Sequence, residues 1–399
     1  MVEPGATSWS VPAPVAVRQS SLRERNLAAI VAAVCRTDVP PSRADLAAEL
    51  SMTRATAGRL VDELVAARVL DEVERTLGGR GRPAKGLLPG TGIVGLGLAV
   101  ETDRLLVRAV DLRGQVVGER DVPSSPRDAE SVLDALAHEA REVRRRLQGR
   151  RLVGVGVAVP GIVDDDGHLL RAPNLRWNDV DVAGMLASVG GRRPVQVANE
   201  ADMAALLEAE PRPGRPGPWT DFVHVSAAVG VGGAIVSGGR VLAGEHGAAG
   251  ELGHVCVDPS GPACGCGSTG CLEQYVGIRA LAEVSGLPRE RVAAELAAGA
   301  ASGDPRVLAA IEQVTHALSV ALASVVNVVG ISSVVLGGHL AALEPGTIEA
   351  IRARLDARVL GSRWKPVQVS VARGDHAAAA TGAAHRALAD VVARPSAWV

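Results

Sequence analysis

Aromatic residues are the scarcest class in this sequence, which contains five Trp, one Tyr and one Phe among 399 residues. Small aliphatic side chains, mainly Ala, Val and Leu, must therefore fill the cores, and they favour close contact between helices and sheets. The sequence also lacks any run of about 18 apolar residues, so it predicts no membrane span. Its first residues have neither the basic start nor the apolar stretch of a secretory signal.

Cysteine is also scarce, and its distribution is uneven. The chain has five cysteines, an odd number, and three of them lie within the eight residues 264–271. This clustering favours metal binding over disulfides and indicates a reducing, cytoplasmic compartment. Residues 1–17, in contrast, are rich in Pro, Gly and Ser and are expected to form a disordered tail.

The cysteine cluster is the most specific pattern in the sequence. His254, Cys264, Cys266 and Cys271 supply one imidazole and three thiolates, which is a complete tetrahedral ligand set for a structural Zn²⁺. The C-x-C-x4-C spacing requires a tight loop, and the glycines within it allow the backbone to close. The alternative is a chance cluster of cysteines in a glycine-rich loop.

Length and charge point to more than one domain. A chain of 399 residues exceeds what one core usually holds, so two or three domains are expected. The net charge is −2, yet residues 18–85 hold twelve Arg or Lys against nine Asp or Glu. A basic N-terminal part on an acidic body is compatible with nucleic-acid binding.

Three short helices are predicted between residues 20 and 70. The first carries apolar residues at helical spacing and ends before Pro40 and Pro41. Ser42 is a good N-cap for the second, with Asp45 in the capping-box position. The buried side of the three helices is expected to comprise Leu22, Leu27, Ile30, Val31, Val34, Leu46, Ala47, Leu50, Leu60, Val61 and Leu64.

The second and third helices, joined by a tight turn at residues 51–53, form a helix-turn-helix pattern. Short side chains on the third helix would let it approach base edges, and Arg54 and Arg59 can reach guanine or a phosphate. The alternative is a plain three-helix unit with solvated arginines. The exposed positions are predicted to be Thr53, Arg54, Ala55, Thr56, Ala57 and Arg59, with Ser42 and Arg43 close to the DNA.

A wing is predicted directly after the third helix. Residues 69–73 favour a strand, and G-G-R-G-R-P follows at residues 78–83. Arg80 and Arg82 have no bulky neighbours, so this arm could enter a narrow minor groove, where the negative potential attracts Arg. A basic flexible linker is the alternative. Residues 18–88 are thus predicted to be a winged helix-turn-helix DNA-binding domain.

From residue 92 the pattern changes to alternating strands and helices, which is typical of an α/β fold. A first lobe is predicted at residues 92–198 and a second at residues 199–375, and a C-terminal helix over residues 376–392 is expected to complete the first. The second lobe would contain the metal loop, residues 254–273, and a long apolar helix over residues 305–329. Two lobes suggest a ligand cleft between them.

The body resembles the ROK family of repressors, open reading frames and sugar kinases. The resemblance rests on G-E-L-G-H followed by C-x-C-G-x-x-G-C-L-E, and runs from about residue 92 to 390. Supporting stretches are V-P-G-I-V at 159–163, A-P-N-L-R-W at 172–177, N-E-A-D at 199–202 and V-V-L-G-G at 334–338. It implies a two-lobed, actin-like sugar-kinase fold, usually in dimers or tetramers, and the N-terminal part places the chain with the repressor branch.

The phosphate-binding residues of the family kinases are not matched. Their D-x-G-G-T loop corresponds here to A-V-E-T-D at residues 99–103, without the metal-binding acid or the two glycines. The second loop, at residues 228–234, has Val229 where kinases have Thr. The general base, Asp in kinases, is replaced by Glu200, whose extra methylene displaces the carboxylate by about 1 Å. No ATP is therefore expected as a cofactor.

The sugar-binding positions of the family are better matched. Carboxylates and amides suit a sugar, because its hydroxyl groups both donate and accept hydrogen bonds. His254 would bind zinc through one ring nitrogen and offer the other to the sugar or to a carboxylate. Glu251 and Glu273 could instead only orient the zinc ligands, and Asn174 could be a turn residue. The matching positions are Asn174, Asn199, Glu200, Glu251, His254 and Glu273.

These patterns predict a cytoplasmic DNA-binding repressor of carbohydrate metabolism genes whose body senses a sugar or sugar derivative. Its expected partners are a double-stranded operator with an inverted repeat and further copies of the chain, in a homodimer or tetramer. The main alternative is an active ATP-dependent sugar kinase that carries a DNA-binding domain. A third is a body that binds no sugar and recruits a protein partner.

Overall fold

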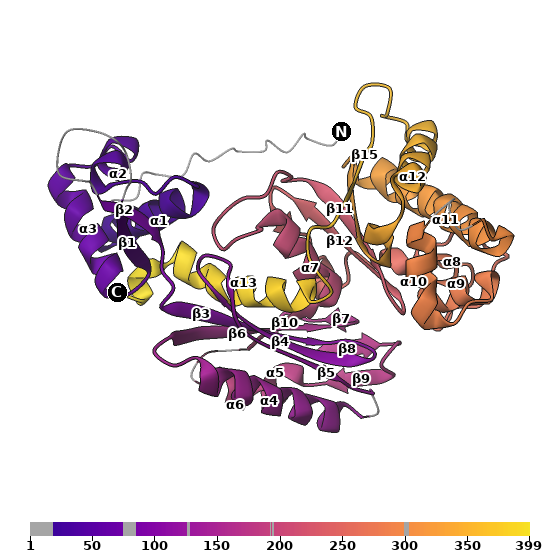
Figure 1. Ribbon diagram of the computed structural model, residues 1–399, viewed down its shortest axis with the longest axis horizontal. Coiled ribbons are helices and arrows are strands. Elements are labelled where there is room, and N and C mark those ends of the chain that lie inside the picture. The colour runs from indigo at the N-terminus through magenta and orange to yellow at the C-terminus, as the bar shows by residue number, and fades with distance from the viewer. Residues whose placement is uncertain (1–18, 75–84, 126–127, 192, 194, 299–302) are drawn as a thin grey trace, which may run out of the picture.

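The computed structural model describes residues 19–74, 85–125, 128–191, 193, 195–298 and 303–399. Figure 1 shows an N-terminal module, a lower lobe and a second lobe at the right. The N-terminal module comprises α1 (Gln19–Arg36), α2 (Arg43–Glu49), α3 (Arg54–Ala66), β1 (Leu70–Glu74) and β2 (Lys85–Pro89). The predicted tail at residues 1–17 and the arm with Arg80 and Arg82 lie outside the described residues.

The second helix of the N-terminal module begins where the sequence predicts. Ser42 caps α2 in a complete capping box with Asp45, and Thr53 caps α3 by accepting a hydrogen bond from the Thr56 amide. The strands β1 and β2 pair in an antiparallel sheet. Most predicted core residues of the module are buried, so three helices and a two-stranded sheet share one core.

Two details of the predicted core are wrong. Leu22, near the start of α1, is half-exposed rather than buried. Ala57, predicted to be exposed on α3, is fully buried. It precedes Leu60 and Val61 by about one turn and therefore lies on the same buried face.

Lobe 1 is defined here by a sheet with strand order β10-β6-β3-β4-β5. The strands β3, β4 and β5 are antiparallel neighbours, whereas β6 runs parallel to both β3 and β10. A small sheet of order β7-β8-β9 follows β6. The elements are β3 (Ile93–Val100), β4 (Arg104–Asp111), β5 (Val116–Pro123), α4 (Ala129–Arg146), β6 (Arg151–Val159), β7 (Ile162–Val163), β8 (Leu169–Ala172), β9 (Trp177–Val180), α5 (Val182–Met185), α6 (Ala187–Gly190) and β10 (Val195–Asn199).

Lobe 2 is defined by a second sheet, with strand order β13-β12-β11-β14-β15. Its pairing repeats that of lobe 1, because β11, β12 and β13 are antiparallel neighbours and β14 runs parallel to β11 and β15. The elements are β11 (Phe222–Ala227), β12 (Val231–Ser237), β13 (Arg240–Val241), η1 (Glu245–Gly247), η2 (Leu252–His254), α8 (Glu273–Val276), α9 (Ile278–Ser285), α10 (Arg289–Ala298), α11 (Pro305–Val329), β14 (Ser333–Gly338), η4 (His339–Ala342), α12 (Pro345–Arg358) and β15 (Gln368–Val371).

The C-terminal helix α13 (Ala378–Ala393) lies on the sheet of lobe 1, opposite α4 (Figure 1). Glycine makes this close approach possible, because a Cβ at Gly97 would stand 1.8 Å from the Ala380 carbonyl oxygen. Helix α7 (Glu200–Ala209) crosses α13 as closely, since a Cβ at Gly382 would stand 1.7 Å from the Met203 carbonyl oxygen. The small side chains expected from the composition are therefore concentrated where helices and sheet meet.

The N-terminal module is joined to lobe 1 by a continuous apolar core. Leu27 and Val31 of α1 share a buried cluster with Leu388 and Val391 of α13 and with Trp398. The last short helix, η5 (Pro395–Ala397), and α13 both contact α1, and Figure 1 shows the C-terminus beneath the module. The C-terminal residues thus form part of the surface on which the N-terminal module packs.

Among the described residues, one helix, α11, is long and apolar enough to cross a membrane by length and composition. More than half of it is buried within lobe 2, where Val314, Leu318 and Leu322 belong to the lobe's apolar core. A buried core helix passes the same test, so this helix is weak support for a membrane span.

Candidate functional site

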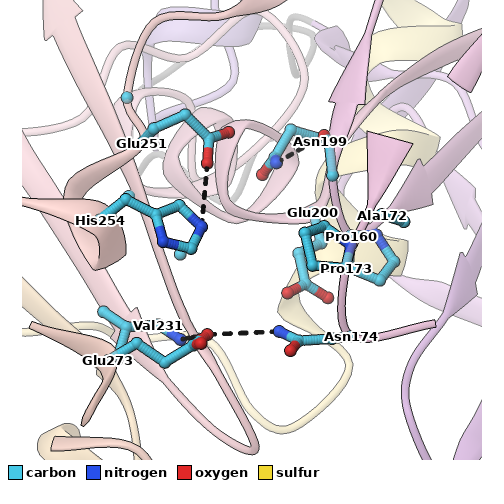
Figure 2. A pocket seen from close by; sticks show the side chains of 14 residues that line it. Pro160, Ala172, Pro173, Asn174, Asn199, Glu200, Val231, Glu251, His254 and Glu273 are labelled. Carbon is cyan, nitrogen blue, oxygen red and sulfur yellow. Dashed lines mark hydrogen bonds and ion pairs between the residues drawn. The ribbon is translucent and has the colours of Figure 1, made fainter. Parts of the chain in front are cut away.

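A polar pocket lies where the two lobes face each other. It contains about 510 Å³ of space, part of it open to solvent. Figure 2 shows two walls, one from the ends of β6, β8 and β10 and one from lobe 2. The lining includes all six predicted ligand-binding residues, Asn174, Asn199, Glu200, Glu251, His254 and Glu273.

The first turn of α7 forms part of one wall. The Asn199 side chain caps this helix, with Oδ1 accepting from the Ala201 amide at 2.7 Å and Nδ2 donating to the Gly161 carbonyl at 2.9 Å. Glu200, the first residue of α7, faces the pocket. Burial raises the pKa of Glu200 to about 7, so near neutral pH its carboxyl group can both donate and accept a hydrogen bond.

Asn174 and Glu273 meet across the pocket. The Asn174 Nδ2 donates to Glu273 Oε2 at 3.3 Å, and the Val231 amide donates to the same oxygen at 3.3 Å. Asn174 is exposed, whereas Glu273 lies at the start of α8 on lobe 2. This contact closes one end of the pocket between residues that are 99 positions apart.

The four predicted metal ligands lie together at the edge of the same pocket. Their donor atoms, one from each of His254, Cys264, Cys266 and Cys271, are all within 4.8 Å of one another. The Cys264 amide donates to the Ser268 carbonyl at 2.8 Å and the Gly267 amide to the Cys264 carbonyl at 3.0 Å, which holds the loop in a tight turn. Three thiols and one imidazole at this spacing fit a single tetrahedral metal ion.

His254 belongs to both the metal cluster and the pocket. Its Nδ1 lies 3.7 Å from Cys264 Sγ, and its Nε2 lies 3.8 Å from Glu251 Oε2. Burial, above all, raises the pKa of Glu251, and Glu273 adds to the shift. Glu273 Oε1 also lies 4.0 Å from Cys264 Sγ. The two carboxylates therefore stand between cluster and pocket, where they could support the metal ligands, bind a ligand, or do both.

The turn that is expected to correspond to the first kinase phosphate loop, residues 99–103, contains two acidic residues. Glu101 and Asp103 lie in the β3–β4 turn, where the Glu101 amide donates to the Arg104 carbonyl. Burial, together with the nearby Glu200 and Asp103, raises the pKa of Glu101 to about 8. Near pH 7 the Glu101 carboxyl group is therefore largely protonated and adds little negative charge to this turn.

The predicted DNA-contacting residues fall into two groups. Arg54 and Arg59 are exposed on α3, and Arg59 pairs with Glu63 at 2.7 Å within the same helix. Thr53 and Thr56 are engaged in the α3 cap, with their hydroxyl oxygens 2.9 Å apart. Ser42 is buried in its cap, and Arg43 forms ion pairs with Asp62 and Glu72. Among these predicted contact residues, Arg54 and Arg59 are therefore the exposed basic side chains that remain available to DNA.

Sequence analysis did not assign several residues that belong to the pocket. Pro160, Gly161 and Pro173 line it, although they occur in stretches that carry the family resemblance. Asp202, in the first turn of α7 behind the lining residues, is partly buried, and burial together with Glu251 raises its pKa to about 7. Its place in N-E-A-D, three residues after Asn199, was the available signal.

Two solved structures share this arrangement of lobes. A ROK family transcriptional regulator, described as a homologue of the E. coli MLC protein, superimposes with a TM-score of 0.74 at 26% identity and covers 93% of this chain and 98% of its own. A ROK family glucokinase from Streptomyces griseus, in complex with glucose and AMPPNP, gives a TM-score of 0.62 at 27% identity and covers 73% and 98%. The fold is thus the two-lobed, actin-like type of the sugar kinases.

The chain belongs to the ROK family, whose model matches residues 96–390. The xylose repressor of Bacillus subtilis is 26% identical over 327 residues, which is 80% of this chain and 84% of that protein. The family expected from the motifs is therefore confirmed, and both repressors and kinases are among its relatives.

Proposed function

We propose that this protein is a sugar-responsive, DNA-binding transcriptional regulator that represses carbohydrate metabolism genes in the cytoplasm. The observation that carries the proposal is a polar pocket between the lobes of a chain whose N-terminal module presents two exposed arginines, Arg54 and Arg59, on α3. Similarity to repressors along most of the chain supports it.

Residues 18–88 would act as a winged helix-turn-helix domain, with α3 in the major groove and β1 and β2 as the base of the wing. Lobe 1, with α13, and lobe 2 would form the sensing body. A homodimer or tetramer would place two α3 helices about one or more helical turns apart, so the operator would be an inverted repeat. The Arg80 and Arg82 arm would enter the flanking minor groove.

The pocket offers a sugar both donors and acceptors from both walls. Asn174, Asn199 and Glu200 would hold it on one side, and Glu251, His254 and Glu273 on the other. A sugar held by both walls would favour a closed arrangement of the lobes, provided that it binds this arrangement more tightly than the open one. The metal cluster would hold a structural Zn²⁺ that keeps His254 in place for this contact.

Operator binding with and without sugar tests this proposal. The purified protein should retard DNA from its own upstream region, and xylose or glucose should change its affinity by about 5- to 100-fold. Saturating sugar at 100 times its Kd should also stabilise the protein by about 2.7 kcal/mol. The variant Glu200→Gln should lose much of both sugar effects and retain operator binding, because it removes one carboxylate of the pocket.

A matched carboxylate outside the pocket provides the control. Glu312 on α11 pairs with Arg354 of α12 at 2.7 Å, so Glu312→Gln should leave both sugar effects unchanged. If no sugar in a panel changes the operator affinity, and none stabilises the protein against thermal unfolding, the result would favour a body that recruits a protein partner.

The second candidate, an ATP-dependent sugar kinase, is favoured by one observation. Glu200 occupies the general-base position and faces the pocket. Because the first phosphate loop lacks both glycines and the second has Val229, we expect no phosphorylation of xylose or glucose above background in a coupled ATPase assay. Turnover of about 1 per second or faster, typical of working enzymes, would instead establish the kinase.

A further inference from the structure

The loop that follows α7 reaches the N-terminal module. Asp38, just after α1, accepts from Arg212 Nη2 and from Arg215 Nη2 of this loop, each at 2.6 Å. Arg212 Nη2 binds Asp38 Oδ1, whereas Arg215 binds Oδ2 through Nη2 and Oδ1 through Nη1. One carboxylate of the module is therefore held by two guanidinium groups that belong to the body.

An apolar contact lies beside this ion pair. A Cβ at Gly214, between the two arginines, would stand 3.0 Å from Cβ of the buried Cys35 and 2.9 Å from a methyl group of Val392. The φ angle of Gly214 is 75°, a conformation that other residues rarely adopt. The loop thus fits closely between α1 and the end of α13.

The same loop is fixed to the end of α7. The Gly217 amide donates to the Ala209 carbonyl at 2.7 Å, and the Gly214 amide donates to Glu210 Oε1 at 2.6 Å. The Glu210 carbonyl lies 3.0 Å from His385 Nδ1 of α13. The loop therefore moves with the last turn of α7 rather than as an independent segment.

Helix α7 connects this loop directly to the pocket. It has ten residues and thus a length of about 15 Å. Its first residue, Glu200, lines the pocket, and its last turn holds the loop that binds Asp38. Since a short helix moves as a rigid body, a displacement of its first turn reaches Arg212 and Arg215.

We propose that Asp38, Arg212 and Arg215 are positioning residues that transmit ligand binding at the first turn of α7 to the DNA-binding module. This inference rests on the proposed function, and it assigns the coupling to one ion-pair latch. The apolar core shared by α1, α13 and Trp398 keeps the module attached to lobe 1, together with an ion pair between Asp71 of β1 and Arg113. The latch sets the orientation of the module about that attachment according to the position of α7.

The exposure of the latch makes it suitable for this role. The side chain of Asp38 is 66% exposed, those of Arg212 and Arg215 41% and 27%. Ion pairs this accessible contribute little to folding stability, so their removal should leave the protein folded. Their geometry is nevertheless specific, because a single carboxylate binds two arginines from a closed loop.

The test compares operator affinity with and without saturating xylose, and separately glucose, in the full-length protein. The measured quantity is the ratio of the two operator dissociation constants. The double variant Arg212→Gln/Arg215→Gln should bring this ratio about threefold or more closer to 1. Its sugar affinity without DNA, measured by calorimetry, and its melting temperature should stay near those of the wild type.

Two further variants separate coupling from a merely structural role. Asp38→Asn should reproduce the loss of coupling, whereas Asp38→Glu, which keeps the charge, should restore most of it. Arg354→Gln breaks a similar exposed ion pair with Glu312, far from the latch, and should leave the ratio unchanged. An unchanged ratio in the double variant overturns the latch alone. A wild type that binds operator but responds to no sugar in the panel, and is stabilised by none, overturns the proposed function on which the latch rests.

Discussion

At the scale of single residues, His254 connects the two halves of the site. Its Nδ1 faces Cys264 and its Nε2 faces Glu251. A metal bound at Nδ1 leaves the proton on Nε2, where it can be donated to the carboxylate or to a ligand. Metal binding would therefore determine both the ring orientation of His254 and the hydrogen bonds that the pocket offers.

The cysteines provide a direct test of the metal. The protein should contain about one Zn²⁺ per chain, and Cys266→Ser should remove most of it and lower the melting temperature by about 5 to 10 °C, since structural zinc contributes folding free energy. Metal analysis and thermal unfolding measure both effects. Cys256 is exposed and lies outside the ligand set, so Cys256→Ser is the matched control. A wild type prepared without chelators that holds no zinc would contradict the assignment.

At the scale of elements, sequence patterns predicted several of the long helices but missed α12, which has 14 residues. The helix expected at residues 305–329 is α11 with the same bounds, and that expected at 376–392 is α13, which begins and ends within two residues of the prediction. The sheet β7-β8-β9 and the short strands β13 and β15 were not predicted. These strands contain two to four residues, too few to show a period.

In the site, too, some features could be predicted from local sequence and others could not. Local spacing sufficed to group the four candidate metal ligands, because three of them share one loop, and to predict the Ser42 cap, which depends on a residue three positions away. The contact between Asn174 and Glu273 joins two lobes, and no local pattern contains that information. Their common position was expected only because the chain resembles a family in which such residues meet.

At the scale of the whole molecule, the three parts are connected in a closed path. The N-terminal module packs on lobe 1 through α13 and Trp398. Helix α7 lines the pocket with its first residue, and its last turn is followed by the loop that binds Asp38. The module is thus attached through the apolar core, through the Asp71–Arg113 ion pair with lobe 1, and through the Asp38 ion pair with the loop after α7. A change in the angle between the attachments would alter the distance between the two α3 helices of a dimer, on which operator affinity depends.

Operator binding by the assembled molecule should depend on Arg54 and Arg59, the exposed arginines of α3. The double variant Arg54→Gln/Arg59→Gln should bind the inverted repeat more weakly, by about 1–3 kcal/mol for each side chain that contacts a base. If both side chains instead neutralise phosphates, the slope of log K against log salt should become shallower by about 1.8 for each bound copy. Gel retardation at several salt concentrations separates the two effects. The control variant is Arg120→Gln. Arg120 lies in lobe 1 and pairs with Glu139 at 2.7 Å, so this variant should bind the operator like the wild type. Equal affinity and equal salt slope in the Arg54/Arg59 variant would show that α3 is not the helix that enters the major groove.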